Sequence, residues 1–186
     1  MDKNIKLAIK AYSELYGNLK KAGNNKKISE NDFTESRKVK KYLERSKDDF
    51  LLANAVKKLI ETSEIRLELG LPQDYQNLYH WLIIISYYSM YHAATAAIAK
   101  KMIKCESHEA TIASLAKHYA TGEDLEFDFI KTLKYIYITY IESGRDKRRG
   151  AQYNVDEQYS KQAAYEVFDD AKKFVKRLQE LLEDEG

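Results

Sequence analysis

The sequence contains very little glycine, proline and cysteine. Its 186 residues include 7 glycines, 1 proline and 1 cysteine. Tight turns, hairpins and bulges depend on glycine and proline, so this scarcity argues against an all-β sandwich and against an α/β sheet with many short loops. The single Cys105 excludes an intrachain disulfide and a metal site built from several cysteines, and it favours a reducing compartment.

Charge is absent from one long internal stretch, and an apolar run is absent from the first residues. Residues 1–6 are charged and lack the apolar run of a signal peptide, so we expect a cytoplasmic protein. Residues 75–99 contain no Asp, Glu, Lys or Arg, which is long enough to span a bilayer. However, polar side chains are scattered along this stretch, which favours a helix enclosed by other helices and no membrane contact: Gln76, Asn77, His80, Ser86, Ser89 and His92.

Hydrophobic residues recur at helical spacing along most of the chain. They make up 44% of the residues, while 32% are charged and 15 residues are tyrosine. The spacing predicts an all-α fold, an up-and-down bundle of four to five helices with a basic helical extension at its N-terminus. The expected helices cover 2–21, 32–70 with a break near Ser46, 74–104, 107–120, 129–144 and 156–183.

Charge is unevenly distributed between two segments. Residues 1–46 hold 12 Lys and Arg against 6 Asp and Glu, whereas residues 47–186 hold 19 against 23. We therefore expect a basic extension over 1–46 and a bundle over 47–186. A basic surface favours nucleic acid or another anionic partner, although a solvated helical surface has the same composition.

Several kinds of catalytic site are excluded by missing motifs. The chain has no glycine-rich phosphate loop, no His-Glu-x-x-His and no Gly-x-Ser-x-Gly. His80 and His92 are twelve residues apart on one expected helix, about 18 Å along its axis, too far to share a metal ion. We expect neither a metal nor a cofactor.

Two local features carry candidate chemistry. Residues 86–94 read Ser-Tyr-Tyr-Ser-Met-Tyr-His-Ala-Ala, and they suit either a packed core or a site. Residues 144–154 are expected to form a polar loop before the last helix. That loop contains four cations that suit phosphate binding, although a solvated loop is the alternative: Arg145, Lys147, Arg148 and Arg149.

Together these segments resemble the HEPN domain family, helical partners of minimal nucleotidyltransferases. The string at 86–94 is close to the Ala-Tyr-Tyr-Ala-Met-Phe-His-Ala-Ala that is typical of the family's central helix. Ser107-His108 fits the pair that opens the next helix, and 148–153 and 171–175 fit the arginine segment and the last helix. The resemblance covers about 47–183 and implies a helical bundle that forms a homodimer.

The resemblance also implies candidate site residues. Many family members are metal-independent endoribonucleases with an arginine followed shortly by a histidine, and the site is shared by two protomers. Here Arg148 occupies the arginine position and Tyr153 the histidine position, after four intervening residues. A phenol with a pKa of about 10 is a poor general acid or base near neutral pH. Supporting candidates are Tyr88, His92, His108 and Asn154.

Three functions follow as expectations. The first is an RNA- or nucleotide-phosphate-binding module paired with a nucleotidyltransferase, as in toxin–antitoxin systems, with Lys38, Lys40 and Lys41 extending the phosphate-contacting surface. The second is an endoribonuclease with an atypical site in which Tyr153 replaces the usual histidine; His92 or His108 would supply acid–base chemistry only if the fold brought one of them near Arg148. The third is a purely structural, dimerising bundle, antitoxin-like or a scaffold, that has no affinity for nucleic acid. In that case Tyr153 would be a target for nucleotide modification by the partner.

Overall fold

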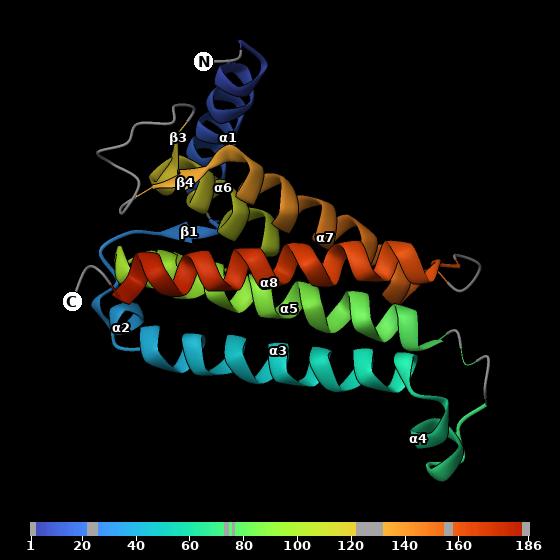
Figure 1. The fold of residues 1–186 in the computed structure, drawn as a ribbon. Coiled ribbons are helices and arrows are strands. Elements are labelled where there is room, and N and C mark those ends of the chain that lie inside the picture. Colours follow the sequence, from blue (N-terminus) through green and yellow to red (C-terminus); the bar gives the residue numbers. More distant parts are fainter. Residues whose placement is uncertain are drawn as a thin grey trace.

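The structure is a computed structural model that describes residues 3–21, 26–72, 75, 77–121, 132–154 and 158–183. The chain is all-α, as predicted, and its helices pack into one bundle (Figure 1). The helices are α1 (Lys3–Lys21), α2 (Phe33–Ser36), α3 (Val39–Glu61), α4 (Ser63–Glu68), α5 (Asn77–Lys100), α6 (His108–Tyr119), α7 (Tyr135–Tyr153) and α8 (Lys161–Glu183). Four two-residue strands join them: β1 (Ile28–Ser29), β2 (Lys104–Cys105), β3 (Ala120–Thr121) and β4 (Leu133–Lys134).

Helix α5 is the centre of the bundle. It packs against α3, α6, α7 and α8, and the chain direction alternates through α3, α5, α7 and α8 (Figure 1). Buried residues occur all around α5, which explains why its sequence is apolar on every side. It is long and apolar enough to cross a membrane, but 67% of its apolar 18-residue stretch is buried inside the protein.

Helix α3 runs through the predicted break at Ser46, so that prediction is wrong. The Ser46 hydroxyl is buried and donates a hydrogen bond to the Ser89 carbonyl oxygen of α5, 2.8 Å away. A small polar residue thus serves a contact between two helices, and the charges after it do not begin a new helix. Helix α3 ends earlier than predicted, at Glu61, and α4 intervenes before Gly70, whose φ of 70° suits glycine.

The predicted loop at 144–154 is also wrong, because helix α7 continues to Tyr153. A Cβ atom on Gly144 would lie 2.6 Å from Met90 Cε and 3.4 Å from Tyr87 Cδ2. This glycine therefore lies where α7 approaches α5 most closely, and it does not end a helix.

The other predicted boundaries are close to those observed. Helix α5 ends at Lys100, before the predicted Lys104, and the Ser107 side chain caps α6 by accepting from the Ala110 N–H. The predicted helix starts at Asp74, Phe129 and Asp156 lie outside the described residues.

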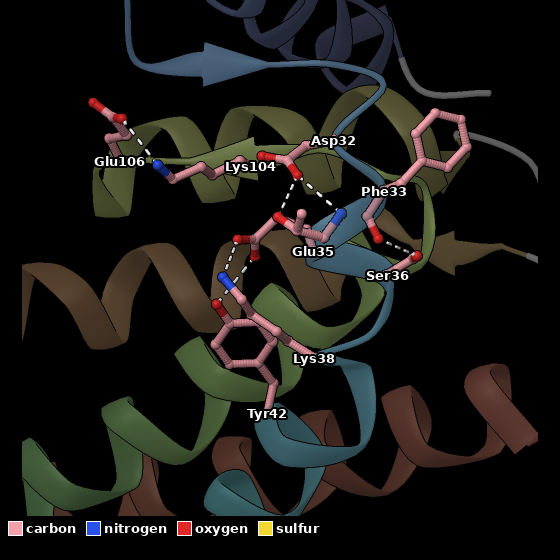
Figure 2. A network of polar contacts seen from close by, with 9 residues as sticks. Asp32, Phe33, Glu35, Ser36, Lys38, Tyr42, Lys104 and Glu106 are labelled. Atoms are coloured by element: carbon pink, nitrogen blue, oxygen red, sulfur yellow. Dashed lines mark hydrogen bonds and ion pairs between the residues drawn. The ribbon is translucent and has the colours of Figure 1, made fainter.

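The N-terminal segment is docked on the bundle. Helix α1 lies on α6, and β1 pairs antiparallel with β2. Figure 2 shows Lys38 and Tyr42 pointing toward the Glu35 carboxylate, which is buried and accepts from both at 2.6 and 3.1 Å. The same view shows Lys104 beside Glu106, 3.4 Å apart. Residues of the basic extension are thus held in internal contacts.

Candidate functional site

Four aromatic side chains form one side of helix α5. Tyr87 and Tyr91, and likewise Tyr88 and His92, are four residues apart, which places each pair one turn apart on the helix. Tyr87 is fully buried and stacks against Tyr91, with ring centroids 6.2 Å apart. The other three are half-buried, and the rings of Tyr87, Tyr88 and Tyr91 all contact His108 at the start of α6, so these side chains form an aromatic surface there.

Helix α7 brings Arg148 to this surface. Gly144 lets α7 approach α5, and Arg148 lies one turn further along the same face. Its guanidinium carbon lies 5.2 Å from the Tyr87 ring centroid and 5.7 Å from that of Tyr88. Aromatic faces attract a cation, so the two rings position this guanidinium.

Arg148 is buried without a counter-ion in the part of the chain that the structure describes. Only 5% of the residue is exposed. Its Nη1 donates to Gln152 Oε1 at 2.9 Å, while its buried Nε has no hydrogen-bond partner. Burying a charge is costly unless it is paired, so this guanidinium suits an anion supplied from outside.

His108 faces Arg148 from the first residue of helix α6. Its Nδ1 lies 2.6 Å from the Tyr87 hydroxyl, and its ring centroid lies 4.2 Å from that of Tyr91. Burial, together with the charge of Arg148, lowers the pKa of His108 from 6.5 to about 4. His108 is therefore neutral near pH 7.

The proton positions follow from the neighbours of Tyr87. Burial raises the pKa of Tyr87, so its hydroxyl stays protonated. The Arg148 guanidinium has only N–H donors, and it favours the oxygen lone pairs turned toward it. We therefore assign the Tyr87 O–H as the donor to His108 Nδ1, which leaves the proton of the neutral imidazole on Nε2.

Arg148 and His108 line a surface hollow of about 430 Å³ between the start of α6 and the second half of α7. Helix α7 contributes Arg145, Arg148 and Arg149, which are spaced three and four residues apart and so share one face. The complete lining is Ser107, His108, Glu109, Arg145, Arg148, Arg149 and Tyr153.

Most of the predicted phosphate-binding residues meet in the hollow, but Lys147 does not. Arg145 donates to Asp146 Oδ1 from Nε at 3.0 Å, so its charge is partly offset. Arg149 is exposed. Lys147 instead pairs with Glu166 of α8 at 3.4 Å. A helix has more than one face, so neighbouring cations that a loop would have presented together are separated.

The last residue of α7 and the residue that follows it take different positions relative to the hollow. Tyr153 lines the hollow, is 71% exposed and has its ring centroid 6.0 Å from the Arg148 guanidinium carbon. Asn154 caps the helix, and its backbone N–H donates to the Gly150 carbonyl oxygen. Asn154 is not part of the lining.

His92 does not line the hollow. Its Nδ1 is 2.6 Å from Asp49 Oδ2 of helix α3, and its ring stacks on Tyr88 with centroids 6.1 Å apart. His92 and Tyr88 therefore support the aromatic surface on which Arg148 rests. None of Lys38, Lys40 and Lys41 lines the hollow.

The sequence did not single out Glu109, although it lines the hollow. In the sequence, Ser107 stands out only as part of the Ser-His pair that opens a helix, and Tyr87 only as part of the string at 86–94. The signal that could have found Glu109 is its place immediately after the Ser-His pair at a helix start. Across the described ranges, no three His, Cys, Asp or Glu side chains come together to hold a metal ion.

Comparisons with known proteins do not identify the chain. No model of a known protein family matches it, and no curated protein is significantly similar to it.

Proposed function

We propose that this protein is a HEPN-like module that binds single-stranded RNA or a nucleotide through a phosphate group in the hollow. The observation that carries the proposal is the buried Arg148, whose Nε has no partner and which has no acidic partner among the described residues. A phosphate oxygen would accept from this guanidinium in the forked geometry that arginine favours.

The other lining groups suit the same ligand. Arg149 is exposed and adds a second cation, and the neutral His108 offers an Nε2 proton as a further donor. Tyr153 offers an exposed ring on which a base stacks. The aromatic and cationic groups thus match the base and the phosphate of one nucleotide.

Fluorescence anisotropy with a labelled single-stranded RNA of mixed sequence tests the proposal. Affinity should fall as salt rises, because phosphate binding releases counter-ions. Arg148→Ala should weaken binding by about tenfold to a hundredfold, as loss of a charge-assisted hydrogen bond does. Lys147→Ala is the matched control, because it removes a neighbouring cation that faces α8.

RNA affinity that is insensitive to salt, or equal in the native protein and Arg148→Ala, would contradict the proposal. Arg149→Ala gives a second reading from an exposed residue, where a folding defect is not expected.

A second candidate is a metal-independent endoribonuclease, favoured by the placement of His108 in the same hollow as Arg148. In the cleavage, the ribose 2′-oxygen would attack the adjacent phosphorus and the 5′-oxygen would leave, giving a 2′,3′-cyclic phosphate and a 5′-hydroxyl. A histidine with a pKa of about 4 is a weak base at neutral pH, which favours binding over cleavage. Incubation of labelled RNA with the protein in EDTA distinguishes binding from cleavage. Only an enzyme yields cleavage products, and these should be absent when Arg148→Ala replaces the native protein.

Two partners remain proposals that rest on the family resemblance. We propose a nucleotidyltransferase as the protein partner and a second copy of this chain in a homodimer. Co-expression with such an enzyme followed by co-purification tests the first, and light scattering after gel filtration tests the second. Mass spectrometry of the co-expressed protein would also detect a nucleotide on Tyr153.

A further inference from the structure

The hollow contains one acidic side chain that phosphate binding does not explain. Glu109 follows His108 in helix α6 and lines the hollow opposite three arginines. Although it shares the hollow with Arg145, Arg148 and Arg149, it makes no ion pair with any of them within the described residues. A carboxylate repels phosphate, so a site for phosphate alone has no use for it.

The two walls of the hollow offer opposite chemistry. The α7 wall presents guanidinium groups and the Tyr153 ring, whereas the α6 wall presents the Glu109 carboxylate and the His108 imidazole. A nucleotide whose phosphate lies on the α7 wall and whose base stacks on Tyr153 would turn a base edge toward α6. A carboxylate on that wall accepts hydrogen bonds from base N–H groups.

We infer that Glu109 is a specificity-determining residue that selects guanine at this site, an inference that rests on the proposed function. A carboxylate has two acceptor oxygens side by side. Guanine is the base whose Watson–Crick edge places two N–H donors next to each other, at N1 and at the exocyclic amino group. Adenine and cytosine offer one amino group there, and uracil offers a single ring N–H. The match between two acceptors and two donors therefore favours guanine.

Glu109 also occupies the first turn of α6, where a negative charge stabilises a helix. That role affects the free energy of unfolding and leaves base preference unchanged, so a binding measurement separates the two roles. The His108 Nε2 proton and the Ser107 hydroxyl can also contact a base, because hydrogen-bond partners occupy only Nδ1 of the imidazole and one acceptor position of the hydroxyl oxygen. Substitution of Glu109 leaves both residues in place, so it isolates the contribution of the carboxylate.

The experiment uses the full chain and short labelled oligouridines that carry one central guanosine, adenosine, cytidine or uridine. We expect the guanosine oligonucleotide to bind about fivefold or more tightly than the other three, the discrimination of a good bidentate contact. In Glu109→Gln this ratio should fall to near one, while binding of the all-uridine oligonucleotide stays equal or becomes tighter because a repulsive charge is lost.

Glu106→Gln is the matched control. It removes the same charge three residues earlier, where Glu106 pairs with Lys104 outside the hollow, and it should keep the guanosine preference. Glu109→Ala should reproduce the loss of preference, which guards against an effect of the introduced amide.

Equal binding of the four oligonucleotides by the native protein, or a preference that Glu109→Gln retains, overturns the inference. If binding is Arg148-dependent but shows no preference, the proposed function stands and the role of Glu109 is refuted. If none of the four oligonucleotides binds, both are refuted.

Discussion

Two buried arginines in this protein differ in whether a carboxylate lies near their positive charge. Arg177 is 6% exposed, and its guanidinium donates to the Thr132 carbonyl oxygen and lies 3.7 Å from Glu180. Arg148 is 5% exposed and has no carboxylate partner among the described residues. Since an unpaired buried charge lowers stability, this contrast supports the proposal that Arg148 binds an anionic ligand.

His108 makes a residue-scale prediction about acid stability. Its pKa is about 4 in the folded protein and about 6.5 in the unfolded chain, so the unfolded state binds a proton first as the pH falls. Its contribution to stability is complete above pH 6.5 and is lost between pH 6.5 and 4. Between these pH values, unfolding of the native protein is accompanied by uptake of up to one proton on His108. In His108→Asn, where the amide oxygen still accepts from Tyr87, this uptake should be absent.

Urea denaturation at pH 8, 6 and 5 measures this effect. The free energy of unfolding should fall less steeply with acid in His108→Asn, by at most about 1.4 kcal/mol per pH unit. The pH 8 value serves as the internal reference, because the histidine is neutral there in both states. Identical slopes for the two proteins would show that His108 is not protected from protonation.

At the scale of elements, the contact between α7 and α5 decides where the site forms. Gly144 allows the approach, and the arginines follow on the same side of α7. Had α7 ended at Gly144, as predicted, Arg148 would have been placed on a solvated loop. The helical continuation instead buries it against Tyr87 and Tyr88.

Gly144→Leu should therefore separate α7 from α5 and destabilise the protein. The new side chain would collide with Met90 and Tyr87, and overpacking costs about 1–3 kcal/mol. Gly17→Leu in α1 is the matched control, because a Cβ atom there meets nothing within 4 Å and leucine favours a helix. Thermal unfolding followed by circular dichroism should show a lower midpoint for Gly144→Leu alone; equal midpoints would refute the close contact.

At the scale of the whole molecule, the basic N-terminal segment is attached through buried side chains. Tyr16 of α1 is 1% exposed, its ring meets His118 of α6 edge to face, and its hydroxyl donates to Glu30. Ile28 of β1 is fully buried, and α3 continues from 39 to 61 across the predicted division at 46. These contacts predict that the segment and the bundle unfold together.

Tyr16→Ala should release α1 from α6, because removal of a large buried ring costs about 3–5 kcal/mol. Limited trypsin digestion followed by mass spectrometry should then show faster cleavage at lysines within 3–21 than in the native protein. Leu7→Ala, on the same helix at a side chain that is 56% exposed, should digest like the native protein. Slow cleavage of α1 in Tyr16→Ala would show that Tyr16 does not hold it.

The fold class and most of the helices could be predicted from the amino-acid sequence. Scarce glycine and proline and apolar residues at helical spacing indicate an all-α bundle, because both are local properties of the chain. The pairing of Arg148 with Tyr153 came instead from the resemblance to a known family, and it stays a prediction. The local signals failed at Ser46 and Gly144, where a residue that usually ends a helix is retained for contact with a neighbouring helix.

Which residues share the hollow depends on tertiary packing. The packing of α6 against α7 brings His108 and Glu109 to the arginines of α7, whereas Lys147 pairs with Glu166 of α8 and His92 with Asp49 of α3. Helix spacing orders side chains around one axis, but the approach of two helices depends on how their small and large residues pack. The burial of Arg148, on which the proposed function depends, arises from that packing.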